Sequence, residues 1–155
     1  MSNLETIIGV ILAGLAVYVS ILVAWYIIMA VANWKIFTKA GEAGWKSLIP
    51  FLNTYVIFKI AWKGSMFWAM IGSLLLGSIL TSIAGEDGGF LAILGAVLVL
   101  ASSVIDIISV HKLSKSFGHG LLFTLGLIFF SPIFTLILGL GKSQYIGPNG
   151  GEEMP

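Results

Sequence analysis

Long apolar runs alternate with short polar segments along this chain of 155 residues. Four of the runs are long enough to cross a bilayer, because a membrane-spanning helix needs about 20 mostly apolar residues. The pattern therefore predicts an all-α integral membrane protein built as a four-transmembrane-helix bundle. Its predicted spans cover residues 7–32, 65–84, 90–110 and 121–140.

A shorter apolar run, residues 47–61, lies between the first two predicted spans and is interrupted by Asn53 and Lys59. It is too short to cross a bilayer comfortably. Ser47 is a suitable helix cap, and Pro50 is tolerated in a first turn, where its missing N–H costs nothing. The polar residues fall on two opposite sides of a helix, which favours a helix packed against the predicted bundle of spans. We therefore expect a cytoplasmic amphipathic or re-entrant helix here, and the pattern leaves both open.

The end of the chain has two features of its own. Pro132 lies inside the fourth run and predicts a kink there, since proline removes a backbone hydrogen bond from a helix. Residues 143–155 are polar and rich in glycine and proline, which predicts a flexible tail. The single membrane domain is therefore expected to cover residues 1–142.

Charge predicts the orientation in the membrane. Residues 33–63 and 111–120 are rich in lysine, and lysine-rich loops stay on the cytoplasmic side. The acidic residues at Glu5, 86–87 and 152–153 then lie outside. Four spans satisfy all of these assignments, with the N- and C-termini both outside.

Composition supports a membrane protein and narrows the chemistry. Hydrophobic residues make up 58% of the chain and charged residues 10%, with a mean hydropathy of +1.05. Soluble domains carry about 25% charged residues. The net charge of +1 gives no reason to expect nucleic acid as a partner, and the lack of cysteine excludes disulfides and thiolate chemistry. The first run lacks a basic n-region and a cleavage site, so we expect a retained span.

Aromatic and basic residues interleave between the first two predicted spans. Residues 33–63 hold three of the five tryptophans and five of the eight lysines, but only one acid, Glu42. Indoles prefer headgroup depth and lysines bind anionic headgroups, which favours a membrane anchor. A docking surface for another membrane protein is a compatible alternative. The candidate lipid or partner surface comprises Trp34, Lys35, Lys39, Trp45, Lys46 and Trp62.

Asp106 is the one acid inside a predicted span. A charge in hydrocarbon is costly, so such residues face the helix bundle and often mark a pathway. Because Asp106 lies near the cytoplasmic end of its span, one interpretation is a structural ion pair with Lys59 or Lys63. The other is a proton or cation site. The candidate polar residues are Asp106, Ser102, Ser103, Lys59, Lys63 and Asn53.

Residues 39–53 read KAGEAGWKSLIPFLN, and a later loop contains Phe117 and Gly118. This combination resembles a family of small bacterial multi-pass membrane proteins, known chiefly as a domain of unknown function. The chain departs from the family at Leu52, where an aromatic residue is expected. The resemblance implies a bacterial cytoplasmic (inner) membrane protein, and some family members carry a signal-peptidase label. The matching positions are Lys39, Ala40, Gly41, Gly44, Trp45, Lys46, Ile49, Pro50, Asn53, Phe117 and Gly118.

The residues do not favour enzyme activity. A signal peptidase needs an exposed serine nucleophile, a lysine with a lowered pKa and a soluble catalytic domain. The lysines other than Lys142 are predicted on the cytoplasmic side, and no soluble domain is predicted. His111 and His119 are eight residues apart without a nearby carboxylate, which favours a surface loop over a metal site. We predict no catalytic residue, no metal and no cofactor.

Two non-enzymatic functions fit these features. The first is an accessory or assembly subunit that packs against another membrane protein or a second copy of itself. Ala16, Ser20 and Ala24 would let helix backbones approach closely in lipid. The alternative is a protomer of an oligomeric transporter or channel for a small solute or ion. Its path would be lined by Asp106, Asn53 and Thr54.

Overall fold

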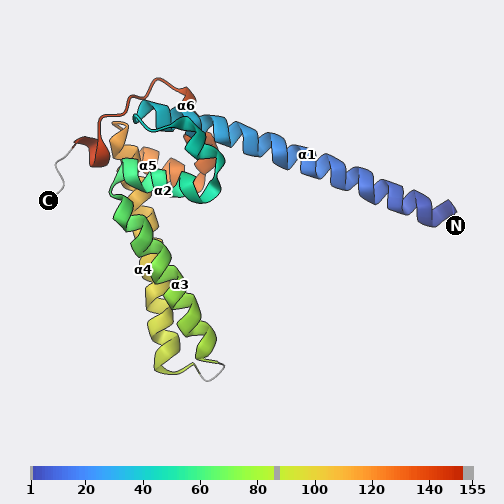
Figure 1. Cartoon of the computed structure of the whole chain (residues 1–155), viewed down its shortest axis with the longest axis horizontal. Coiled ribbons are helices and arrows are strands. Elements are labelled where there is room, and N and C mark those ends of the chain that lie inside the picture. Colours follow the sequence, from blue (N-terminus) through green and yellow to red (C-terminus); the bar gives the residue numbers. More distant parts are fainter. Residues whose placement is uncertain (1, 86–87, 152–155) are drawn as a thin grey trace.

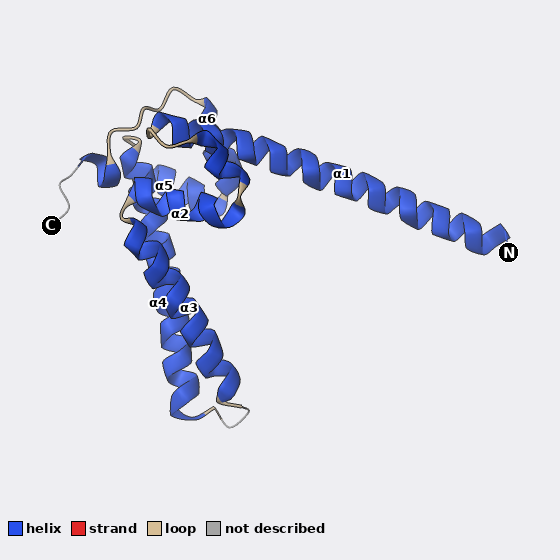
Figure 2. Ribbon diagram, viewed as in Figure 1, coloured by secondary structure: helices blue, strands red, loops and turns tan. Residues whose placement is uncertain are grey.

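The structure, a computed structural model, describes residues 2–85 and 88–151. These residues form helices and connecting turns, with no strand among them (Figure 2). The predicted acidic turn at 86–87 and the acidic pair at 152–153 lie outside the described residues. The elements in chain order are α1 (Ser2–Lys39), η1 (Gly44–Leu48), α2 (Pro50–Ala61), α3 (Gly64–Ile83), α4 (Gly89–Ser116), α5 (Leu121–Phe129), α6 (Ser131–Leu140) and η2 (Pro148–Gly151).

A compact head carries two arms that extend in different directions (Figure 1). The head consists of residues 30–62 and 109–151. One arm is the first part of α1, whose residues 3–28 are all exposed, and the other is the hairpin of α3 and α4. Within the described residues α1 packs against α6, η1 and α2, and it packs against neither α3 nor α4. The structure therefore does not contain the predicted bundle of four spans, because α1 meets the hairpin of α3 and α4 only through the head.

Three helices are long and apolar enough to cross a membrane: Asn3–Lys39, Gly64–Ile83 and Gly89–Ser116. They correspond to the first three predicted spans. Their outward-facing side chains are largely apolar, as expected of helices whose solvent is lipid. The all-helical architecture and three of the four predicted spans thus agree with the structure.

The fourth predicted span, residues 121–140, is two short helices instead of one. The ring centroids of Phe123 and Phe134 are 5.0 Å apart, whereas eleven residues of continuous helix would separate them by about 16 Å. The chain therefore folds back on itself between α5 and α6. Phe130 has non-helical backbone angles, and Pro132 lies in the first turn of α6. Proline cannot donate the hydrogen bond that would continue α5, which explains a kink. The chain reverses completely because Phe134 of α6 packs against Gly126 of α5.

The hairpin of α3 and α4 depends on two glycines where the helices cross. A Cβ atom added to Gly77 would lie 2.7 Å from the carbonyl oxygen of Gly95. Thr81 lies against the same crossing and donates its hydroxyl hydrogen to the carbonyl of Gly77, at 2.9 Å. Small residues let helix backbones approach this closely in a membrane, and the sequence places Gly77 and Thr81 one turn apart.

The helix predicted over 47–61 forms from Pro50 onward. Pro50 occupies the first turn as predicted, but the capping position belongs to Ile49 and no side chain caps the helix. Ser47 was the expected cap, and its hydroxyl group instead donates a hydrogen bond to the carbonyl of Ala30 in α1, at 3.1 Å. The predicted cap is thus wrong, and Ser47 ties η1 to α1.

The core of the head is built around α2. This helix contacts α1, α3, α4, η1 and η2, so it is an internal element of the head. Contacts on several sides of α2 agree with the prediction that polar residues occupy two opposite sides of this helix. The core cluster consists of Ile36, Phe37, Val56, Ile60, Ala61, Leu113, Phe117 and Leu138.

The polar tail is packed against the head. The hydroxyl group of Tyr145 donates a hydrogen bond to the carbonyl of Ile60, at 2.8 Å. The N–H of Ile146 donates to the carbonyl of Ser116, also at 2.8 Å. Both acceptors lie at the ends of helices, where carbonyl groups lack helical partners. Residues 143–151 thus contact the head, and the flexibility predicted over 143–155 stays a prediction. Residues 152–155 lie outside the described part.

The two ends of the described chain lie far apart (Figure 1). Lys39, at the end of α1, donates hydrogen bonds through Nζ to the carbonyls of Leu138 (2.7 Å) and Gly141 (2.8 Å), so the tail begins beside it. Asn3 lies at the opposite end of a helix of 38 residues, which is about 57 Å long. No membrane is part of the structure, so the orientation predicted for the two termini stays a prediction.

Candidate functional site

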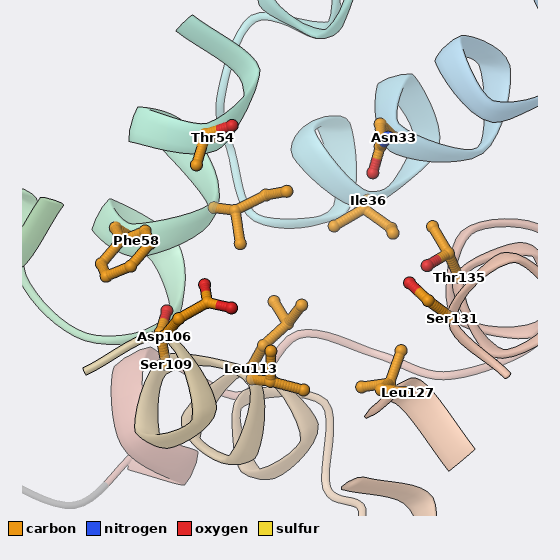
Figure 3. A pocket seen from close by; sticks show the side chains of 12 residues that line it. Asn33, Ile36, Thr54, Phe58, Asp106, Ser109, Leu113, Leu127, Ser131 and Thr135 are labelled. Carbon is orange, nitrogen blue, oxygen red and sulfur yellow. The ribbon is translucent and has the colours of Figure 1, made fainter. Parts of the chain in front are cut away.

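A cavity of about 160 Å³ lies where the hairpin arm meets the head, between α1, α2, α4, α5 and α6 (Figure 3). Asp106, the one acid inside a predicted span, lines this cavity. Apolar side chains form most of its wall, with polar groups at a few places, as in many small-molecule sites. The lining residues are Asn33, Ile36, Thr54, Ile57, Phe58, Asp106, Ser109, Val110, Leu113, Leu127, Ser131 and Thr135.

Helical spacing aims the polar side chains at the cavity. Asp106 and Ser109 are three residues apart on α4, and Ser131 and Thr135 are four apart on α6, so each pair lies on one face of its helix. Asn33 comes from the buried side of α1. In Figure 3, Asp106 faces the cavity from one side, and Asn33, Ser131 and Thr135 lie across from it. The break between α5 and α6 gives α6 this position.

Most of these polar groups have no hydrogen-bond partner among the described residues. The Oγ atom of Ser109 is buried and unpaired. The side chains of Asn33, which is 9% exposed, and of Ser131 and Thr135 make no hydrogen bond within the described chain. Leaving a buried polar group unpaired costs roughly 1–3 kcal/mol, and this cost applies to Asn33 and Ser109, because Ser131 is exposed and Thr135 is half-buried. A polar occupant, such as water or a hydrated ion, would satisfy them together.

Asp106 has no cationic partner in the part of the chain that the structure describes. Lys59 lies instead 2.5 Å from Oε1 of Glu42, and Lys46 lies 2.5 Å from its Oε2. Lys63 precedes α3 and forms no ion pair with Asp106 either. The described residues therefore contain no ion pair between Asp106 and Lys59 or Lys63, since Lys59 is paired with Glu42. The role of Asp106 stays a prediction.

Of the other predicted polar residues, Thr54 lines the cavity together with Asp106, whereas Ser102, Ser103 and Asn53 do not. Ser102 and Ser103 line a separate shallow groove that also reaches Asp106, and both hydroxyl groups bond to the carbonyl of Val99. Asn53 has a buried, unpaired Oδ1 atom but lines neither site. The sequence reasoning missed Asn33, Ser109, Ser131 and Thr135. Their signal is weak: single polar residues spaced three or four apart in apolar helices.

The candidate lipid or partner surface does not form one patch. Lys39 is used inside the head to cap the end of α6, and Lys46 is held by Glu42. Trp62 lies beneath the ammonium group of Lys112, 4.8 Å from the ring centroid. The remaining members, Trp34, Lys35 and Trp45, are exposed.

The two histidines occupy separate places. His111 Nδ1 is 2.9 Å from the hydroxyl group of Thr124, and His119 Nε2 is 2.7 Å from that of Ser143. His119 also stacks on Phe123, with ring centroids 4.0 Å apart. The described residues contain no group of three His, Asp or Glu side chains placed to hold a metal ion.

Comparison with known proteins gives one match. Residues 45–148 match the model of DUF5684, a family of unknown function. No curated protein and no solved structure matches the chain. The matched range begins at Trp45, so it contains every lining residue of the cavity except Asn33 and Ile36 of α1.

Acid is expected to destabilise the head through Glu42. Hydrogen bonds from Lys46 and then Lys59 lower the pKa of Glu42 below its ordinary value of 4.5. A lowered pKa in the folded state gives stability that is complete above the unfolded pKa and is lost as the pH falls through the folded pKa. The unfolding temperature in detergent should therefore fall as the pH drops below about 4.5.

The variant Glu42→Gln tests whether the ion pairs of Glu42 cause the loss of stability in acid. It should lower the free energy of unfolding at neutral pH by about 1 kcal/mol, because both lysines are partly exposed. It should also flatten the pH dependence, whereas Glu5→Gln, at an exposed acid of α1, should leave it intact. Equal slopes in the Glu42→Gln and unmodified proteins would rule the ion pairs out as the cause.

Proposed function

We propose that this chain, which belongs to the DUF5684 family of unknown function, is a non-enzymatic integral membrane protein that binds a small cation around Asp106 and acts as one protomer of a transporter or channel. One observation carries this proposal. A carboxylate without a cationic partner among the described residues shares a cavity with four polar side chains that also lack partners. Ionisable groups at membrane depth are costly and typically mark a functional pathway.

The chemistry of the lining favours a cation. Asp106 supplies negative charge, and Asn33, Ser109, Ser131 and Thr135 supply neutral oxygen atoms, which are ligands that hard cations prefer. The cavity volume of about 160 Å³ compares with roughly 30 Å³ for one water molecule in the liquid. It therefore suits a small, partly hydrated cation rather than a large organic solute.

Transport by this chain requires association with further chains. Three separate spans cannot enclose a path alone, and the two arms do not pack together. Several copies arranged around the heads would place their cavities along a shared route. Closed symmetric assemblies are the usual form of such oligomers.

The proposed topology has the head in the cytoplasm and three spans, α1, α3 and α4. All eight lysines lie in the head or next to it, and none lies near Asn3 or Gly88 at the far ends of the arms, which fits the positive-inside rule. The hairpin of α5 and α6 is then re-entrant. Its helices of 9 and 10 residues are too short to span, and its tip at Phe129 and Phe130 is exposed and apolar.

Single cysteines test this topology in a chain that has none of its own. Asn3→Cys should react with a membrane-impermeant maleimide on intact cells. Lys142→Cys should react only after the membrane is opened, because the tail begins beside the cytoplasmic end of α1. Lys35→Cys serves as a cytoplasmic control. Labelling of positions 3 and 142 from the same side would disprove a spanning α1.

The variant Asp106→Asn tests the cation site. It removes the charge with little change of shape, so cation affinity should fall about tenfold or more, the equivalent of losing one charge-assisted contact. Folding should persist, because the substitution removes an unpaired charge. Cation-dependent shifts of the unfolding temperature measure cation binding and show that the protein is folded. Flux into proteoliposomes measures transport.

Glu42→Gln is the matched control, since it removes a carboxylate that lies outside the cavity. Flux should survive in Glu42→Gln and be lost in Asp106→Asn. Unchanged cation binding in a folded Asp106→Asn protein would refute the cavity as the site.

An accessory or assembly subunit is the second candidate, and the isolated arm of α1 favours it. Residues 3–28 are exposed and mostly apolar, and Tyr26, near the head end of this arm, donates a hydrogen bond to the carbonyl of Leu48 in η1. Ala16, Ser20 and Ala24 form a stripe of small residues along this arm. The hydroxyl group of Ser20 is already satisfied by the carbonyl of Ala16, at 2.8 Å, so the stripe is free to pack against another membrane helix.

A photo-crosslinking amino acid at Ser20 tests this candidate, with Leu22 as the control on nearly the opposite side of the same exposed helix. A stoichiometric product with another membrane protein from position 20 would identify an accessory subunit. A dimer of this chain would instead support the oligomeric transporter. Equal products from positions 20 and 22 would contradict specific packing along the stripe.

A further inference from the structure

The charge of the cavity around Asp106 limits which cation the cavity can hold. Asp106 is the one charged residue among the lining residues, so the lining carries a single negative charge. The other lining side chains are either apolar or neutral and polar. A bound ion is therefore balanced by one carboxylate alone.

We propose that the ion bound in this cavity is a monovalent alkali-metal cation, an inference that rests on the cation site proposed above. One carboxylate and one monovalent cation are neutral together. A divalent cation would keep a net charge of +1 between largely apolar walls, and an uncompensated charge is costly in such surroundings. Calcium sites usually gather several carboxylates, and the described residues contain no group of three His, Asp or Glu side chains that could hold a metal ion.

The neutral groups of the cavity can offer oxygen lone pairs to an ion. Thr54 donates its hydroxyl hydrogen to a backbone carbonyl of its own helix, at 3.2 Å, so only the lone pairs of its oxygen remain for an occupant. Asn33, Ser131 and Thr135 can each turn an oxygen towards the cavity, and Figure 3 shows these three residues across from Asp106. An ion between the two sides would exchange part of its hydration shell for protein oxygens.

These oxygens also separate an alkali-metal ion from a proton. Protonation would neutralise Asp106 without any of them. The buried Oγ atom of Ser109 and the buried side chain of Asn33 would then stay without partners among the described residues. An ion would contact oxygen atoms from several helices at once, and the volume of about 160 Å³ leaves room for it with some of its water.

A groove beside the cavity gives the ion a route to Asp106. The side chain of Asp106 is exposed and lines both the cavity and the groove, whose volume is about 310 Å³. Ser102 and Ser103 also line the groove, and both donate their hydroxyl hydrogens to the carbonyl of Val99, at 2.7 and 3.2 Å. Their oxygens therefore keep only lone pairs for an occupant, which suits a cation.

Unfolding temperatures in an uncharged detergent test the choice of ion. The chlorides of Na⁺, K⁺, Mg²⁺ and Ca²⁺ are compared with choline chloride at one pH and one ionic strength. Na⁺ or K⁺ should raise the unfolding temperature in a saturable way. Its affinity should exceed the affinities for Mg²⁺ and Ca²⁺ by at least about tenfold, and Asp106→Asn should abolish the rise.

A matched pair of variants tests the neutral oxygens. Thr135→Val replaces a hydroxyl group of the cavity with a methyl group of similar size, and should weaken the monovalent affinity about fivefold. Thr38→Val makes the same change at an exposed threonine outside the cavity, and should leave the affinity unchanged. Equal effects of the two variants would contradict a role for the lining oxygens.

A second carboxylate tests the charge argument directly. Ser131→Asp adds an acid across the cavity from Asp106, at an exposed position in the first turn of α6, where a negative charge is tolerated. It should shift the preference towards Ca²⁺ by at least about tenfold. Ser131→Asn has nearly the same shape without the charge and should keep the monovalent preference. An unchanged preference in a folded Ser131→Asp protein would contradict the charge argument.

The outcomes separate the choice of ion from the cation site itself. Asp106-dependent binding of Mg²⁺ or Ca²⁺ as tight as that of Na⁺ and K⁺ would overturn the monovalent assignment and leave a cation site in place. Proton flux that depends on Asp106 and needs no alkali-metal ion would do the same. An unmodified protein whose unfolding temperature responds to none of the four cations, and which carries no flux, would overturn both.

Discussion

The reversal of the chain between α5 and α6 is the constraint on which the head depends. It returns α6 to the end of α1, where a Cβ atom on Gly139 would lie 3.0 Å or less from the backbone of Ala32. Only glycine permits that approach. Lys39 then binds the carbonyls at the end of α6, a favourable position for a cation at a helix C-terminus. Held in this way, α6 presents Ser131 to the face of α4 that carries Asp106. A straight helix over 121–140 would carry Ser131 away from the head and open the cavity.

Hydropathy identifies the length of a helix well and its continuity poorly. It found α1, α3 and α4 because each supplies an uninterrupted apolar stretch that only lipid or protein can cover. It also found α2, whose start at Pro50 follows from local chemistry. The run 121–140 has the same length and composition as a span, but its break depends on tertiary packing. Phe134 occupies the space that a side chain at position 126 would need, and no pattern in the sequence shows that the two will meet.

The part of the site that the sequence predicted depends on local composition, and the part that it missed depends on tertiary packing. Asp106 is recognisable because an acid in an apolar helix is costly and therefore informative. Its neighbours in the cavity come from α1 and α6, and their contribution depends on how those helices are rotated. Lys59 was expected to pair with Asp106 but pairs with Glu42. Charge alone does not show which of the two carboxylates a lysine will bind. Glu42 binds two lysines at once because the turn after α1 brings it between η1 and α2.

α4 joins the candidate site to the hairpin arm. One face of this helix lines the cavity through Asp106 and Ser109. α5 lies against the same end of α4, where Thr124 is linked to His111, and its Leu127 closes the cavity. The contact between α4 and α5 therefore fixes one wall of the proposed cation site, and a change that separated the two helices would open the cavity.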